Sequence, residues 1–152
     1  MSMRERIMSA MKMAMKDKDT LRVSTLRLIN AAIKEREIAL RSNEDAGDID
    51  NDEILQILSK MVKQRDDSVK AYEAAEREDL ASRERAEIKV IREFLPKPLT
   101  EEEMSKAVED AIKDTGATSI KDMGKVMGAL KAQYTGRMDF GAVGASVKAA
   151  LG

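Results

Sequence analysis

Apolar residues recur along most of the chain at intervals of three and four positions, which is the period of an α-helix. Near the start, Ile7, Met11 and Ala14 follow this spacing, and later stretches repeat it. No stretch shows the strict alternation of apolar and polar residues that marks a half-buried β-strand. The pattern therefore predicts an all-α fold.

Helix-start and helix-end signals divide this pattern into seven predicted helices. Ser2 with Glu5 and Thr100 with Glu103 have the spacing of a capping box, and Gly116 stands where a C-terminal glycine cap belongs. A polar loop is expected at 42–51, and the charged stretch 76–79 is expected to mark a bend. The predicted helices cover residues 2–16, 20–40, 50 to the bend, the bend to 95, 100 to the cap at 116, 119–133 and 139–151.

The two prolines of the chain lie close together, at Pro96 and Pro98. Proline restricts the residue before it and has no backbone N–H to donate, so it ends helices. This segment is the best candidate for a boundary between structural parts. We therefore predict a four-helix N-terminal domain at 1–96 and a compact three-helix C-terminal domain at 97–152.

Composition excludes several classes of function. The 152 residues contain neither Cys nor His, which removes thiolate chemistry, the usual general base near neutral pH and the commonest metal ligand. We therefore predict no catalytic residue, no metal site and no cofactor. No apolar run approaches the roughly 20 residues that span a bilayer, so no membrane segment is expected, and the cytoplasm is the expected compartment.

Charge is balanced overall and unevenly distributed. The formal net charge is −1, which argues against binding nucleic acid through bulk charge. Residues 116–152 nevertheless hold five basic and two acidic residues, or +3, whereas residues 97–115 hold three basic and six acidic residues, or −3. In the N-terminal part, the charged run at 60–67 is typical of a solvated helix face.

The helix predicted at 119–133 is the best candidate for a binding surface. One face holds apolar residues, and a second face holds Lys121, Gly124, Lys125 and Gly128. The residues of the apolar face are Ile120, Met123, Met127, Leu130 and Tyr134. A glycine inside a helix costs about 0.5–1 kcal/mol relative to alanine, so two of them four positions apart suggest a smooth surface with a purpose. Lysines beside such a surface suit a phosphate backbone, which needs only charge and access. The alternative, which these residues alone favour, is that another helix packs closely on the glycines and the lysines are merely solvated.

The turn that follows offers a second candidate. Gly136 permits a positive backbone φ, Asp139 is placed to cap the last helix, and Arg137 precedes that helix N-terminus, where exposed amides favour anions. A phosphate or carboxylate could bind there. An ordinary turn with an exposed arginine is the commoner outcome for such a sequence.

Six stretches, taken in order along the chain, resemble the YqeY family, whose fold is shared with the C-terminal tail of the amidotransferase subunit GatB. The resemblance extends over essentially the whole chain. The stretches are MKMAMKDKD (11–19), TLRLINAAIK (25–34), KQRDDS (63–68), YEAAEREDL (72–80), EIKVIREFLP (87–96) and KDMGKVM (121–127).

The resemblance implies two all-helical parts and a link to tRNA, because the GatB tail is implicated in holding tRNA while the chemistry of that enzyme lies in other domains. By this resemblance we expect a non-catalytic tRNA-binding or RNA-binding protein, or an adaptor. Its contact residues would be Lys121, Gly124, Lys125, Gly128, Lys131 and Arg137. Two alternatives stay open: a protein–protein interaction module without a nucleic-acid role, and a contributor to carbon–nitrogen ligase activity with glutamine as amide donor.

Overall fold

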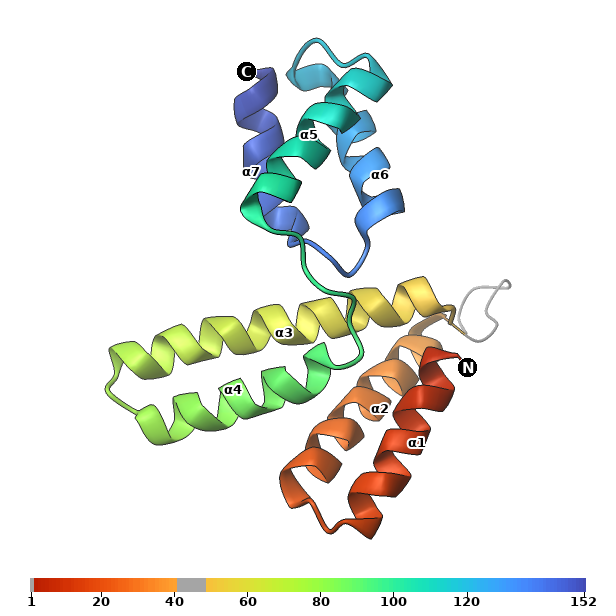
Figure 1. Ribbon diagram of the computed structural model, residues 1–152, viewed down its shortest axis with the longest axis vertical. Coiled ribbons are helices and arrows are strands. Elements are labelled where there is room, and N and C mark those ends of the chain that lie inside the picture. Colours follow the sequence, from red (N-terminus) through yellow and green to blue (C-terminus); the bar gives the residue numbers. More distant parts are fainter. Residues whose placement is uncertain (1, 41–48) are drawn as a thin grey trace. The chain divides into compact units, whose positions relative to one another are not determined.

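A computed structural model describes residues 2–40 and 49–152, and in these ranges the chain forms α-helices, one short 3-10 helix and no strand. The all-α prediction is confirmed (Figure 1). The helices are α1 (Met3–Lys16), α2 (Thr20–Leu40), α3 (Asn51–Ala74), α4 (Glu78–Arg92), α5 (Glu101–Thr115), the 3-10 helix η1 (Ile120–Asp122), α6 (Met123–Tyr134) and α7 (Phe140–Leu151).

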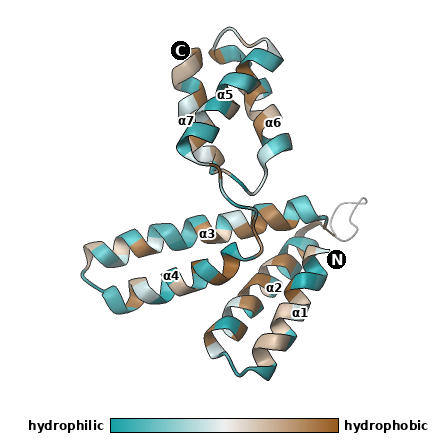
Figure 2. Cartoon of the chain, in the orientation of Figure 1, coloured by the Kyte–Doolittle hydropathy of each residue, from teal (hydrophilic) through white to brown (hydrophobic). Residues whose placement is uncertain are grey.

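Contacts between residues divide the chain into two compact units, Met1–Leu95 and Pro96–Gly152. The predicted boundary after residue 96 lies one residue from this division. Each unit has a hydrophobic core of its own. Figure 2 shows that the helices carry both hydrophilic and hydrophobic positions, as expected of helices that bury one face.

The N-terminal unit consists of two helical hairpins, α1–α2 and α3–α4, in which α4 also packs against α2 (Figure 1). The predicted capping box at Ser2 and Glu5 starts α1, and the Asp50 side chain accepts the Glu53 amide at the start of α3. Each hairpin turn contains a residue with positive φ, Lys18 in the first and Glu76 in the second. Most of the loop predicted at 42–51 lies outside the described residues.

The core of the N-terminal unit is aliphatic. Fully buried side chains come from all four helices, so no helix can bury its apolar face alone. They include Ile7, Leu26, Ile29, Ile54, Leu58 and Ile91.

One ion pair joins α3 to α4 at the edge of this core. The Nε of Arg65 lies 3.0 Å from a carboxylate oxygen of Glu87, whose exposed fraction is only 8%. The same guanidinium donates from Nη1 to the Met61 carbonyl oxygen at 3.2 Å. The solvated face expected for the run 60–67 is therefore wrong at Arg65, because its long side chain reaches back to the neighbouring helix.

The C-terminal unit is a bundle of α5, α6 and α7. The capping box at Thr100 and Glu103 starts α5, and Gly116 ends it with φ 67° in the left-handed region. The core includes Val108, Val126, Leu130, Val143 and Val147.

The start of α6 differs from the predicted continuous helix at 119–133. Residues Ile120–Asp122 form the 3-10 helix η1, and α6 itself begins at Met123. The Asp122 carboxylate accepts the Thr118 amide at 3.0 Å, which holds a tight turn ahead of the α-helix. Ile120, which lies in this 3-10 turn, is 45% exposed rather than part of the buried face. Val126 of α6, which the prediction did not place on the apolar face, is fully buried.

Leu58→Ala is expected to lower the free energy of unfolding by about 2–5 kcal/mol, because it empties a fully buried site between helices. Leu28→Ala is the matched control: this leucine of α2 is 44% exposed, and its loss should cost about 1 kcal/mol or less. Urea unfolding followed by circular dichroism measures both. Equal losses for the two variants would contradict the described core.

Candidate functional site

The five predicted site residues between 121 and 131 lie on one exposed face of η1 and α6. Lys121, Gly124, Lys125, Gly128 and Lys131 are all exposed. Val126 and Leu130, on the opposite side of α6, are fully buried. The α6 face, defined as these five exposed residues, is thus presented to the surroundings of the C-terminal unit.

Within the C-terminal unit, nothing packs on the two glycines of the α6 face. A Cβ atom built at Gly124 or Gly128 would meet no heavy atom of this unit within 4 Å beyond the backbone of its own helix. The sequence-based preference for a helix packed on these glycines therefore finds no support among α5 and α7, the other two helices of the unit. Two helix-weakening residues are retained at positions where an alanine would fit freely.

Gly144 in α7, by contrast, lies against a neighbouring helix. It is buried, and a Cβ there would lie 3.6 Å from the Met123 methyl and 4.0 Å from that of Met127, both on the neighbouring α6. Sequence reasoning did not single out Gly144. Its place beside Val143 on the apolar face of α7 is the signal that could have found it.

The lysines of the α6 face are available for contacts. Within the C-terminal unit, no ion pair shorter than 4.0 Å engages Lys121, Lys125 or Lys131. Lys131 lies over the ring of Phe140, with 6.0 Å from Nζ to the ring centroid. The α6 face therefore carries three cations without an internal counter-charge in contact.

Arg137 lies apart from the α6 face. It is half-buried in the turn before α7, and its Nε donates to the Lys97 carbonyl oxygen at 3.0 Å. Its own carbonyl oxygen accepts the Leu99 amide at 3.0 Å. The predicted turn geometry is confirmed, since Gly136 has φ 85° and Asp139 accepts the Gly141 amide at 2.9 Å. Arg137 thus ties the segment before α5 to the turn before α7.

Two carboxylates of the C-terminal unit are held ionised by local hydrogen bonds. The Thr118 amide lowers the pKa of Asp122 below its ordinary value of 3.8, and Lys125 adds a smaller electrostatic contribution. The Thr100 amide, in the capping box, lowers the pKa of Glu103 below its ordinary value of 4.5. Both groups are fixed anions at neutral pH, and both stabilise turns that position α5 and α6.

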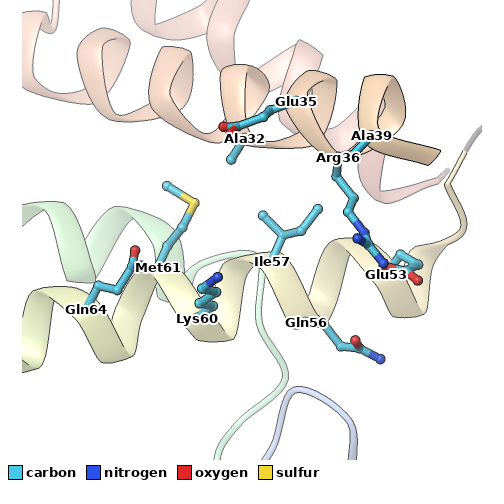
Figure 3. A pocket seen from close by; sticks show the side chains of 10 residues that line it. All are labelled: Ala32, Glu35, Arg36, Ala39, Glu53, Gln56, Ile57, Lys60, Met61 and Gln64. Atoms are coloured by element: carbon cyan, nitrogen blue, oxygen red, sulfur yellow. The ribbon is translucent and has the colours of Figure 1, made fainter. Parts of the chain in front are cut away.

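A separate groove of about 610 Å³ lies between α2 and α3 of the N-terminal unit (Figure 3). Ile57 and Met61 point from α3 towards α2, while Arg36 reaches from α2 to Glu53, with 3.4 Å between Nε and the carboxylate. Amides and charges of both signs line the remainder. They belong to Glu35, Gln56, Lys60 and Gln64.

Neither a metal-binding cluster nor a helix that could cross a membrane occurs among the described residues. Across residues 2–40 and 49–152, no three acidic side chains gather in a way that could hold a metal ion. Over the same ranges, no helix combines the length and apolar character needed to cross a membrane.

These features belong to a known class of all-helical proteins. The family model described as Yqey-like protein matches residues 4–151, which is nearly the whole chain. The protein is a member of this family, as the six sequence stretches indicated.

Similar proteins of yeasts carry the name "Altered inheritance of mitochondria protein 41, mitochondrial". The protein of Vanderwaltozyma polyspora is 40% identical over 87 residues, covering 56% of this chain and 44% of the relative. That of Candida glabrata is 36% identical over 85 residues, covering 56% and 45%. That of Saccharomyces cerevisiae is 28% identical over 123 residues, covering 78% and 64%. The matches thus span about half to two thirds of these relatives, whose name states a compartment and no activity.

Gly124→Ala and Gly128→Ala are each expected to raise the free energy of unfolding by about 0.5–1 kcal/mol, since the added methyl group meets open space. Gly116→Ala is the control with the opposite sign, because its positive φ strains any L-residue. Thermal unfolding of the full chain measures all three. Destabilisation by either α6 variant would show that the glycine is needed for the fold.

The depressed pKa values predict loss of stability in acid. A carboxylate with a lowered folded pKa stabilises the protein above its unfolded pKa, and this contribution disappears as the pH falls through the folded value. The contribution of Glu103 should therefore begin to fall near pH 4.5 and that of Asp122 near pH 3.8. Each contribution should be lost once the pH lies below the lowered pKa of that group in the folded protein. A titration of the Asp122 carboxyl by NMR checks the cause: its midpoint should lie below 3.8, and a midpoint at or above that value would contradict it.

Proposed function

We propose that this protein is a non-catalytic RNA-binding protein whose C-terminal unit holds structured RNA, tRNA in the first place, by its phosphate backbone. The observation that carries the proposal is the pair of open glycines, Gly124 and Gly128, within a face that also presents three exposed lysines without an ion-pair contact in the C-terminal unit.

The energetics of α6 support an external ligand. Two glycines in an exposed 12-residue helix together cost about 1–2 kcal/mol relative to alanines. No contact within the C-terminal unit offsets this cost. Residues that weaken a fold without an internal reason are typical of surfaces that serve a ligand.

The chemistry of the α6 face favours phosphate over a base edge or an acidic protein. Lysine is a flexible point charge without the fork geometry that arginine uses for bidentate recognition. Phosphate contacts require only charge and close approach, and they position a nucleic acid without selecting its sequence. Between Lys121 and Lys131 the glycines leave the helix surface low enough for such an approach.

The acidic residues of the same unit would orient the complex. Helix α5 begins with Glu101, Glu102 and Glu103 and is a different wall of the bundle from α6. A polyanion is therefore repelled by α5 and attracted by α6. A net charge of −1 for the whole chain is compatible with binding through one face only.

We propose tRNA among the structured RNAs because the chain resembles the GatB tail, which is implicated in holding tRNA. The resemblance supplies no activity, because that tail lies outside the catalytic domains of the amidotransferase. For the compartment we propose the cytoplasm, although the yeast relatives carry a mitochondrial name. Fractionation of cells that express the tagged full-length chain decides between the two.

A protein partner is the second candidate, and the groove between α2 and α3 is the observation that favours it. Its apolar floor at Ile57 and Met61 and its polar rim suit a partner's side chains. Absence of RNA binding at low salt would leave this candidate in place of the first.

Replacing Lys121, Lys125 and Lys131 by Ala is expected to weaken tRNA binding and to reduce the slope of log K against log salt by about one for each lysine. The measurement is a titration of labelled tRNA with the full-length chain at several salt concentrations. Lys113→Ala, on the acidic helix α5, is the matched control and should leave the slope unchanged. An unchanged affinity and slope for the triple variant would refute the assignment of these lysines.

The variant Arg137→Ala is measured in the same titration, together with its free energy of unfolding. Its Nε bond to the Lys97 carbonyl oxygen makes a loss of stability part of the expected result. The fraction of unfolded protein is therefore measured for this variant as well. Arg137 is assigned to phosphate binding only if the affinity for tRNA falls by more than this unfolded fraction accounts for.

A further inference from the structure

We infer that the α6 face fits the shallow minor groove of double-helical RNA, so that the protein prefers base-paired RNA to single strands and to DNA duplexes. This inference rests on the proposed function and names the form of RNA that the same face accepts.

The aromatic side chains of the C-terminal unit pack within the fold and do not form a stacking surface. Tyr134 and Phe140 are its two aromatic residues, and both pack against the hydrophobic core. The face of Phe140 is further covered by Lys131. Proteins that hold single strands stack the unpaired bases on aromatic side chains, whereas the α6 face presents lysine and backbone.

Four of the five residues of the α6 face lie on α6, and Lys121 lies on η1 directly before it. Lys125 and Lys131 are six residues apart, which places their backbones about 9 Å apart along the helix axis. A row of lysines along one side of a helix can contact phosphates that flank a groove. A flexible single strand would have to be ordered on this row and would gain no stacking in return.

The open glycines favour RNA over DNA. The minor groove of an A-form helix is wide and shallow, and it displays the 2′-hydroxyl groups at its surface. At Gly124 and Gly128 no side chain of the C-terminal unit lies within 4 Å of the position that a Cβ atom would take, so the helix backbone is accessible there. Backbone carbonyl oxygens there can accept a further hydrogen bond from a 2′-hydroxyl, which DNA lacks.

The test compares three labelled probes with the full-length protein at one low salt concentration: an RNA duplex of about 16 base pairs, one of its strands alone, and the DNA duplex of the same sequence. We expect the RNA duplex to bind about tenfold more tightly than either of the other two. Fluorescence polarisation supplies the dissociation constants.

Gly128→Leu examines the close approach directly. The Cβ atom of a leucine at this position meets no atom within 4 Å, and leucine favours the helix more than glycine does, so the variant should fold while it loses the preference for RNA duplex. Gln133→Leu is the matched control, because Gln133 is exposed on α6 but lies outside the α6 face. This variant should keep the preference of the parent chain for the RNA duplex.

The outcomes separate the inference from the proposed function. Equal or tighter binding of the single strand, or equal binding of the DNA duplex, would overturn the inference and leave RNA binding intact. A preference that survives Gly128→Leu would also overturn it. Failure of all RNA probes and of tRNA to bind would overturn the proposed function itself.

Discussion

Burial of aliphatic helix faces against one another is the constraint on which this structure depends. The chain has two Phe, two Tyr and no Trp, so its cores must be filled by aliphatic residues and Met. Each unit meets this demand separately, with Ile, Leu and Val at the centre of the first and mostly Val and Ala with Leu130 at the centre of the second. Each helix buries its aliphatic face only against the aliphatic faces of the other helices of its unit. The position of each helix is therefore set by its neighbours.

The same packing of apolar residues determines which residues of α6 lie on its exposed face. Val126 and Leu130 fix the rotation of α6 about its axis, because both must point into the core. With the rotation fixed, Gly124 and Gly128 have to face outward among the lysines. The candidate RNA-binding surface is thus a direct consequence of the packing on the other side of one short helix.

Much of the fold could be predicted from the sequence, because its signals are local. Capping boxes at Ser2 and Thr100, the glycine cap at Gly116 and the proline pair after Leu95 each act within a few residues. Of the two departures, one is local and one arises across the fold. The 3-10 turn at Ile120 is held by a hydrogen bond from Thr118 to Asp122, a side-chain interaction that the apolar pattern does not indicate. The inward course of Arg65 depends on Glu87 in another helix.

The site shows the same division. The sequence placed Lys121, Gly124, Lys125 and Gly128 on one face, and the structure has that face exposed. Whether a helix covered the glycines could not be decided from spacing, since open and packed glycines have the same period. Gly144 was missed for that reason, because its packing against Met123 and Met127 depends on how α7 meets α6.

The central claim is that the open glycines serve a ligand at the expense of the fold. Its most direct test is the double variant Gly124→Ala/Gly128→Ala, with the free energy of unfolding and the affinity for tRNA measured on the same preparation. We expect opposite changes, with the free energy of unfolding raised by about 1–2 kcal/mol and the affinity for tRNA lowered. A variant that gains this stability and binds tRNA as tightly as the parent chain would contradict it.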